Sequence, residues 1–154
     1  MNVSEKEQII RNRELCEKYP FLLPYDAVDG QDSFDPRNDI IDSDFDYSFT
    51  MFDCVPKGWK SLFLSLCDEV RSYVEQHKDI EPFVRFVDIK EKWGALRMEI
   101  SCGDKGLWDI LTKYEKMSQT VCVSCGAPAT RISRGWICPY CDRCIGDMQS
   151  DQIG

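Results

Sequence analysis

The chain has 154 residues, of which 43% are hydrophobic and 30% are charged. These values are typical of one ordinary folded domain with its own core. The sequence has no apolar run of about 18 residues, so it predicts no membrane-spanning helix. The formal net charge is −8, and most of the acidic excess lies before residue 113. This balance disfavours broad nucleic-acid binding, because phosphate binding draws its energy mainly from Lys and Arg.

The cysteine content and the N-terminus indicate a reducing compartment. The first residues, MNVSEKEQ, have neither the basic start nor the apolar stretch of a secretory signal. The chain holds nine cysteines, but disulfide scaffolds of that density belong to much shorter secreted chains. We therefore expect a cytoplasmic protein whose thiols are reduced.

The N-terminal third is predicted to form one helix followed by an acidic segment. A helix over 5–18 begins at the capping box of Ser4 and Glu7 and ends before Pro20. The following segment, 26–53, combines many Asp with Phe, Tyr and Ile. It is either a solvated loop whose aromatic residues pack on the core, or a surface that docks on a basic partner.

The acidic segment supplies candidate binding residues. On the docking interpretation these are Asp42, Asp44 and Asp46. A calcium loop is rejected, because the required Gly and the Glu at the twelfth position are missing.

The middle of the chain predicts an α+β core. Apolar residues at steps of three and four predict a helix from Trp59 to about His77. Strands are expected over 83–90 and 95–101, and another helix is expected after Gly103. The turn between the strands places Trp93 beside Lys92, where an exposed aromatic residue would mark a binding surface. The other three tryptophans are expected in the core.

Cysteine spacing is the most specific pattern in the chain. Cys122 and Cys125 form one C-x2-C pair, and the run CPYCDRC over 138–144 offers a second. Two such pairs bring four thiolates around one Zn²⁺, and a closed four-sulfur site is structural. The spacing alone allows either Cys138 with Cys141 or Cys141 with Cys144 as the second pair.

Enzymatic activity is not expected. His77 is the only histidine, and no nucleophile elbow, phosphate loop or HExxH pattern is present. Asp88 and Lys90 have the D-x-K spacing of a metal-dependent nuclease strand, but the preceding acidic strand is missing. A charged hairpin face that includes Glu91 and Lys92 is the simpler interpretation.

Three motifs in fixed order support a resemblance. They are Gly58-Trp59, the run KEKWGALR over 90–97, and the C-terminal cysteine motif with its CDRC ending at Cys144. Over residues 56–145 the chain resembles a family of small uncharacterised proteins from bacteriophages, prophages and bacteria. That family has a K-E-K-[FW]-G-x-L-R hairpin and a C-terminal zinc ribbon. The resemblance implies the ligand set Cys122, Cys125, Cys141 and Cys144, and a bacterial cytoplasm.

The resulting prediction is an α+β protein with a small antiparallel hairpin or sheet, two or three helices and a C-terminal zinc ribbon. Four parts are expected: 1–55 with the helix and acidic segment, the core over 56–119, the ribbon over 120–145, and a flexible tail over 146–154.

We expect a non-enzymatic zinc protein that binds a protein partner, as an inhibitor of a host or anti-phage defence component. The alternative is a nucleic-acid-binding regulator that uses Arg131, Arg134 and Arg143, and a metal-dependent nuclease is a remote third.

Overall fold

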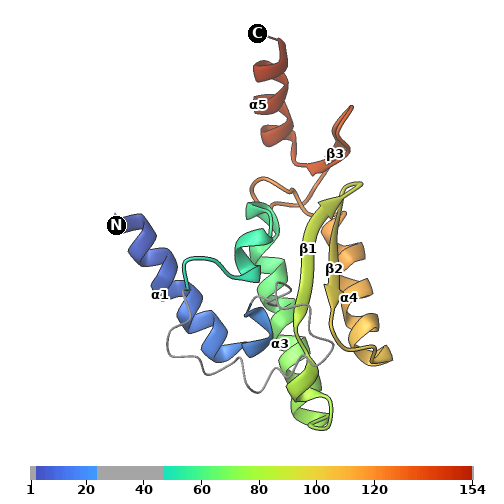
Figure 1. Cartoon of the computed structure of the whole chain (residues 1–154). Helices are drawn as coiled ribbons and strands as arrows, with labels where there is room; N and C mark the ends of the chain where they lie inside the picture. Colours follow the sequence, from blue (N-terminus) through green and yellow to red (C-terminus); the bar gives the residue numbers. More distant parts are fainter. Residues whose placement is uncertain (1–2, 24–46, 154) are drawn as a thin grey trace.

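The computed structural model describes residues 3–23 and 47–153 and has the expected α+β architecture. An antiparallel hairpin packs with three helices, and the smaller cysteine module lies at one end of this body (Figure 1). The helices are α1 (Val3–Lys18), α3 (Lys60–Gln76), α4 (Lys105–Ser118) and α5 (Asp142–Ile153). The strands are β1 (Phe86–Lys92), β2 (Ala95–Ile100), β3 (Arg131–Ile132) and β4 (Pro139–Tyr140).

The core lies between the two long amphipathic helices and the β1–β2 hairpin. Apolar residues on one side of α3 and of α4 are buried, as the spacing of three and four predicts. Phe63 of α3 packs against Phe86 of β1 with 5.3 Å between ring centroids. The short helix η1 (Pro20–Leu22) adds Phe21, whose ring lies 5.8 Å from that of Phe86. Residues on both sides of the acidic segment therefore contribute to one core.

The β1–β2 hairpin is shorter than predicted at its start and tighter at its turn. Residues Glu81–Phe83 form a short 3-10 helix, η5, instead of the start of a strand, and Pro82 lies in its first turn. Trp93 and Gly94 alone make the turn, with φ of 55° and 82°. Two left-handed residues are typical of a type I′ hairpin turn, which matches the twist of the strands. A tryptophan in this conformation is uncommon, because its side chain crowds the backbone.

Helix α1 is fastened to the rest of the core through one carboxylate. Asp53 lies in the short helix η3 (Met51–Cys54) and accepts hydrogen bonds from Arg11 at 2.6 Å, from Asn12 at 2.9 Å and from Gln8 at 3.2 Å. The same side chain accepts from the backbone N–H of Thr50 at 2.8 Å. Asn12 is fully buried, so its amide depends on these partners.

Replacing Asp53 with Ala is expected to lower the free energy of unfolding by about 2–3 kcal/mol, because it removes the acceptor of hydrogen bonds from Arg11, from the buried Asn12 amide and from the N–H of Thr50. Equilibrium urea unfolding measures this loss. The control is Glu17→Ala, which removes an exposed ion pair with Arg13 on the same helix and should cost less than about 0.5 kcal/mol. Equal losses for the two variants would contradict the assigned role of Asp53.

The cysteine module is attached to the core at the entrance to α3. The backbone N–H of Gly58 donates to Val123 O at 2.9 Å, and Trp59 Nε1 donates to Val121 O at 2.9 Å. Gly58 and Trp59 lie in the short helix η4 (Lys57–Trp59), and both are buried. Gly58 and Trp59, the first of the three motifs, therefore hold the cysteine module against the core.

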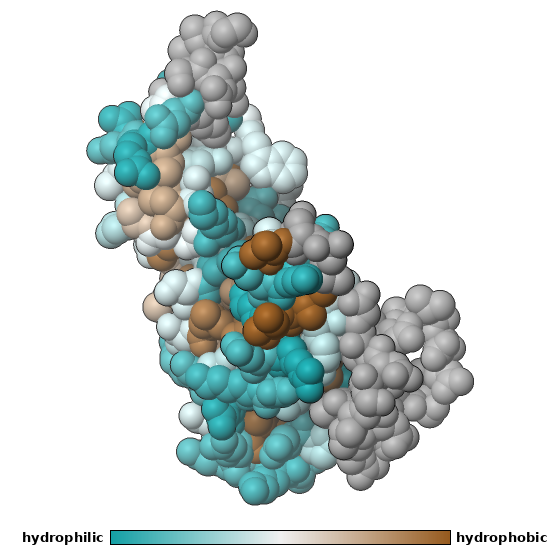
Figure 2. Space-filling view, turned by 90° about the vertical axis from the view of Figure 1, so that its left-hand side faces the viewer, coloured by the Kyte–Doolittle hydropathy of each residue, from teal (hydrophilic) through white to brown (hydrophobic). Residues whose placement is uncertain are grey.

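Helix α5 runs from Asp142 to Ile153, so a fourth helix covers most of the segment for which a tail was predicted. In Figure 1 it extends from the module away from the core. Figure 2 shows a face on which hydrophilic side chains predominate over the lower body and apolar ones lie in separate patches. Within the described residues, no helix is both long and apolar enough to cross a membrane.

Candidate metal centre

The structure brings together four cysteine sulfurs, those of Cys122, Cys125, Cys141 and Cys144. All four Sγ atoms lie within 4.8 Å of one another, and the pair Cys125–Cys141 is 3.6 Å apart. A tetrahedral Zn²⁺ with Zn–S distances of about 2.3 Å places its sulfurs about 3.8 Å apart. The four thiols therefore fit a closed metal site, and a tetrahedral sulfur set suits zinc or iron.

The first cysteine pair sits in a tight turn after α4. The backbone N–H of Cys122 donates to Ala127 O at 2.7 Å, and that of Gly126 donates to Cys122 O at 2.9 Å. Gly126 has φ of +87°, a conformation that favours glycine. A Cβ on Gly126 would also lie 3.0 Å from Gly58 O. This glycine therefore both closes the turn and allows the core to approach it.

The second pair lies where β4 meets α5. Cys141 follows the strand directly, and the backbone N–H of Cys144 points to Cys141 Sγ at 3.5 Å. The N-terminus of a helix carries partial positive charge, which favours nearby thiolates. The second pair is thus held by a helix start. The sequence interpretation missed this helix, although Asp142, the second residue of CDRC, is a good first-turn residue.

In the absence of metal, two of the four thiols have pKa values shifted in opposite directions. Burial opposes ionisation of Cys122, but backbone N–H groups of Cys141, Cys125 and Ser124 together lower its pKa to about 6. The pKa of Cys144 is raised to about 12, first because its thiol hydrogen-bonds with Cys141 and also because of desolvation. One sulfur is therefore ready as a thiolate, while another must lose its proton to bind a metal.

Zinc binding near neutral pH is expected to release at least one proton, because metal and proton compete for the sulfur of Cys144. The affinity should accordingly fall as the pH is lowered. Isothermal titration calorimetry in buffers of different ionisation enthalpy measures the released protons. A binding enthalpy that does not change between buffers would contradict this assignment.

Cys138 lies outside the four-sulfur cluster. It is 4% exposed, and its backbone N–H donates to Ser133 Oγ at 3.0 Å. Burial raises the pKa of its thiol to about 12, and a hydrogen bond with Glu91 acts in the same direction. Its place in the structure is therefore in the contact between the module and the β1–β2 turn.

Glu91 joins the two hairpins through both of its carboxylate oxygens. Oε1 accepts from the backbone N–H of Gly94 at 2.8 Å, and Oε2 accepts from Trp136 Nε1 at 2.8 Å. Gly94 also lies close to Ile137, since a Cβ there would be 3.3 Å from Ile137 O. Glu91, predicted as part of a charged hairpin face, thus also connects the β1–β2 turn with the β3–β4 loop.

Two of the four tryptophans are more exposed than the sequence analysis predicts. Trp59 is fully buried, as predicted, and Trp93 is 70% exposed at the hairpin tip beside the exposed Lys92. The prediction that Trp136 and Trp108 lie in the core is wrong, because they are 76% and 39% exposed. Trp136 follows Gly135, a left-handed turn residue with φ of 79°, in the loop between β3 and β4.

The remaining candidate residues occupy separate places. Asp42, Asp44 and Asp46 lie outside the described residues. Arg131, Arg134 and Arg143 are exposed, and Arg131 is paired with Asp142 at 3.1 Å. Lys90 is paired with Asp88 at 3.2 Å, so the two charged residues of the D-x-K spacing neutralise each other.

His77 caps the end of α3. Its Nδ1 is 2.8 Å from Tyr73 O, and its ring stacks on that of Tyr73 with a centroid distance of 4.0 Å. The tyrosine hydroxyl in turn donates to Asp104 at 2.6 Å. These contacts join the C-terminal end of α3 to the start of α4, which is a structural use of the histidine.

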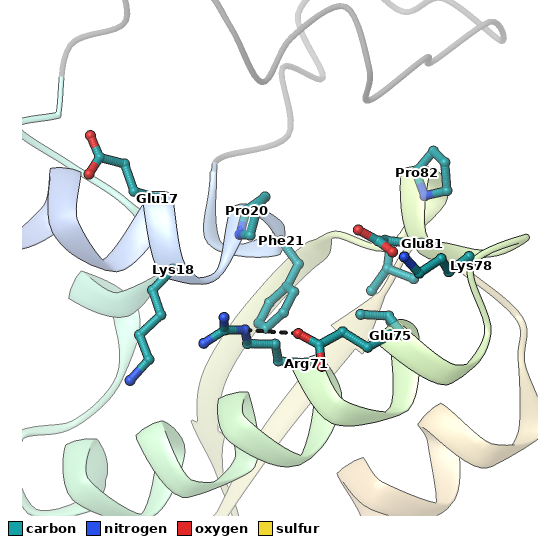
Figure 3. Close-up of a pocket in the computed structure, with 11 residues that line it drawn as sticks. Glu17, Lys18, Pro20, Phe21, Arg71, Glu75, Lys78, Glu81 and Pro82 are labelled. Atoms are coloured by element: carbon teal, nitrogen blue, oxygen red, sulfur yellow. Dashed lines mark ion pairs between the residues drawn. The ribbon is translucent and has the colours of Figure 1, made fainter.

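A hollow in the surface lies beside the C-terminal part of α3 (Figure 3). It has a volume of about 570 Å³ and includes Lys18, Phe21 and Lys78 in its lining. Arg71 and Glu75, which also line it, form an ion pair at 3.3 Å. The charges around it are mixed in sign, so the lining selects neither an anion nor a cation.

No family model, curated protein or solved structure matches this chain. The fold and the cysteine cluster therefore define its class: a small α+β protein with a four-cysteine site that could hold a metal ion.

Proposed function

We propose that the chain is a non-enzymatic zinc-binding protein that acts by binding another protein. The distances between the four sulfurs suit a tetrahedral Zn²⁺, which supports the metal assignment. Closed four-sulfur zinc sites are structural. The site stands between two hairpins and α5, so the metal would stabilise the surface that these elements carry. The cluster offers four sulfurs and leaves no open coordination position, which argues against a catalytic metal.

The observation that carries the protein-binding proposal is the pair of exposed indoles on neighbouring hairpins. Trp93 and Trp136 are 70% and 76% exposed, and both line the same hollow. Ile132 and Ile137 extend the apolar area, with exposures of 70% and 43%. We call these four residues the indole surface. Exposed tryptophans on rigid turns are typical anchors of protein interfaces.

The biological setting is part of the same proposal. The resemblance of residues 56–145 to small phage, prophage and bacterial proteins supports a bacterial cytoplasm and a host or defence protein as the partner. Inhibition of that partner is the action we propose. The nucleic-acid alternative is less well supported, because Arg131 is paired with Asp142 and the net charge is −8.

A comparative pull-down from bacterial lysate tests the proposal. The tagged, zinc-loaded chain is compared with Trp93→Asn, which suits a left-handed turn residue. Trp108→Gln serves as the matched control, since it removes an exposed indole from α4 instead. We expect one protein that survives nuclease treatment, is captured by the parent and the control, and is lost with Trp93→Asn. Recovery that vanishes with nuclease, or that is independent of Trp93, would contradict the proposal.

A further inference from the structure

The indole surface contains two adjoining hollows. The first, about 290 Å³ in volume, is lined by Glu91, Lys92, Trp93, Gly135, Trp136 and Ile137. The second, about 260 Å³ in volume, has Gly94, Ile132 and Pro139 in its lining. Trp93 and Ile137 line both hollows, so the two are neighbours along one surface. Each hollow is large enough to receive a large apolar side chain.

An extended segment of a partner fits this arrangement. Side chains i and i+2 of an extended chain point to the same side, about 7 Å apart. Two apolar residues at that spacing could enter the two hollows and enclose the Trp93 indole between them.

The surface is held ready for such a ligand before it binds. Glu91 fixes Trp136 through Nε1 and fixes the β1–β2 turn through Gly94 N–H. Ser133 Oγ donates to Trp136 O and accepts from Cys138 N–H, which orders the loop that carries the indole. A preorganised surface loses little side-chain freedom on binding.

The charges at the edge of the hollows favour carboxylates on the ligand. Lys92 lines the first hollow, and Arg134 adjoins Gly135. Within the part of the chain that the structure describes, neither cation has an ion pair or hydrogen bond. The one acidic residue of the lining, Glu91, already accepts two N–H donors. The charge that is available for pairing is therefore positive.

We propose that the indole surface binds an extended peptide segment of the partner that carries two apolar side chains at i and i+2, flanked by Asp or Glu. The inference rests on the proposed function and specifies its ligand. A single nucleic-acid strand is disfavoured, because each nucleotide brings a phosphate, whereas Lys92 is the one cation among the described residues that lines the hollows.

Selection from a displayed library of random short peptides tests the ligand class. The immobilised full chain, loaded with zinc, selects binders, and Trp93→Asn is used for counter-selection. We expect enriched sequences with apolar residues two apart and with Asp or Glu beside them. Enrichment of basic sequences, or no enrichment that depends on Trp93, would overturn the inference. A parallel selection from a random single-stranded DNA pool that yields Trp93-dependent binders would overturn it as well.

Charge reversal on the selected peptides provides the second measurement. Lys92→Glu with Arg134→Glu is expected to weaken binding by about tenfold or more, as loss of close charge pairs does. Lys6→Glu on α1 is the matched control and should leave the affinity unchanged. If the pull-down shows a Trp93-dependent protein but the double reversal has no effect, the ligand class is wrong while the proposed function stands.

Discussion

Replacing Cys144 with Ser is expected to remove most of the zinc affinity of the chain and to unfold the module that carries β3, β4 and α5. The four sulfurs are placed to close around one ion, and structural zinc sites of this kind contribute about 10–16 kcal/mol of binding free energy at neutral pH. Losing one thiolate from a closed set also leaves the metal open to water. Native mass spectrometry measures the zinc content, and circular dichroism measures the loss of helix.

The matched control for this prediction is Cys138→Ser, which separates the two ligand sets that the spacing allows. Cys138 is outside the cluster, so this variant should keep one zinc per chain. Its thiol is buried against Glu91, so a modest loss of stability is compatible with retained metal. Zinc lost from Cys138→Ser and kept in Cys144→Ser would show that the second pair has been assigned wrongly.

Helices α3 and α4 and the β1–β2 hairpin could be predicted because their patterns are local. The spacing of apolar residues located α3 and α4, and the alternation after Gly94 located β2. The C-x2-C spacing likewise identified the cysteine pairs as candidate metal ligands, because two cysteines at this spacing close a turn whatever surrounds them. Predictions based on one element at a time therefore held.

The parts that were missed depend on contacts between elements that are far apart in sequence. Glu91 looks like a surface charge in its own strand, because its contact with Trp136 joins residues that are 45 positions apart. The exposure of Trp136 has the same origin, because the loop that carries it projects from the module. Helix α5 was overlooked because the cysteine spacing by itself accounted for the residues of its first turn.

Gly58→Ala is the second change with a large expected effect, because this glycine is where the core and the module touch most closely. A Cβ there would overlap the carbonyl oxygen of Cys122 and lie 2.5 Å from the carbonyl carbon of Val123. These are backbone atoms of the first cysteine pair, so they cannot move aside without moving the metal site. We expect the free energy of unfolding to fall by about 3 kcal/mol or more.

The control for Gly58 is Gly103→Ala, where an added Cβ meets nothing within 4 Å. It adds the same methyl group at a position with open space around it, and should lower the free energy of unfolding by less than about 0.5 kcal/mol. The two effects of Gly58→Ala can be separated by measuring unfolding with and without zinc. A clash with a metal-stabilised turn should cost more when zinc is bound, because the turn is then less able to shift. If Gly58→Ala and Gly103→Ala unfold alike in zinc, the tight contact between η4 and the first cysteine pair does not hold the module to the core.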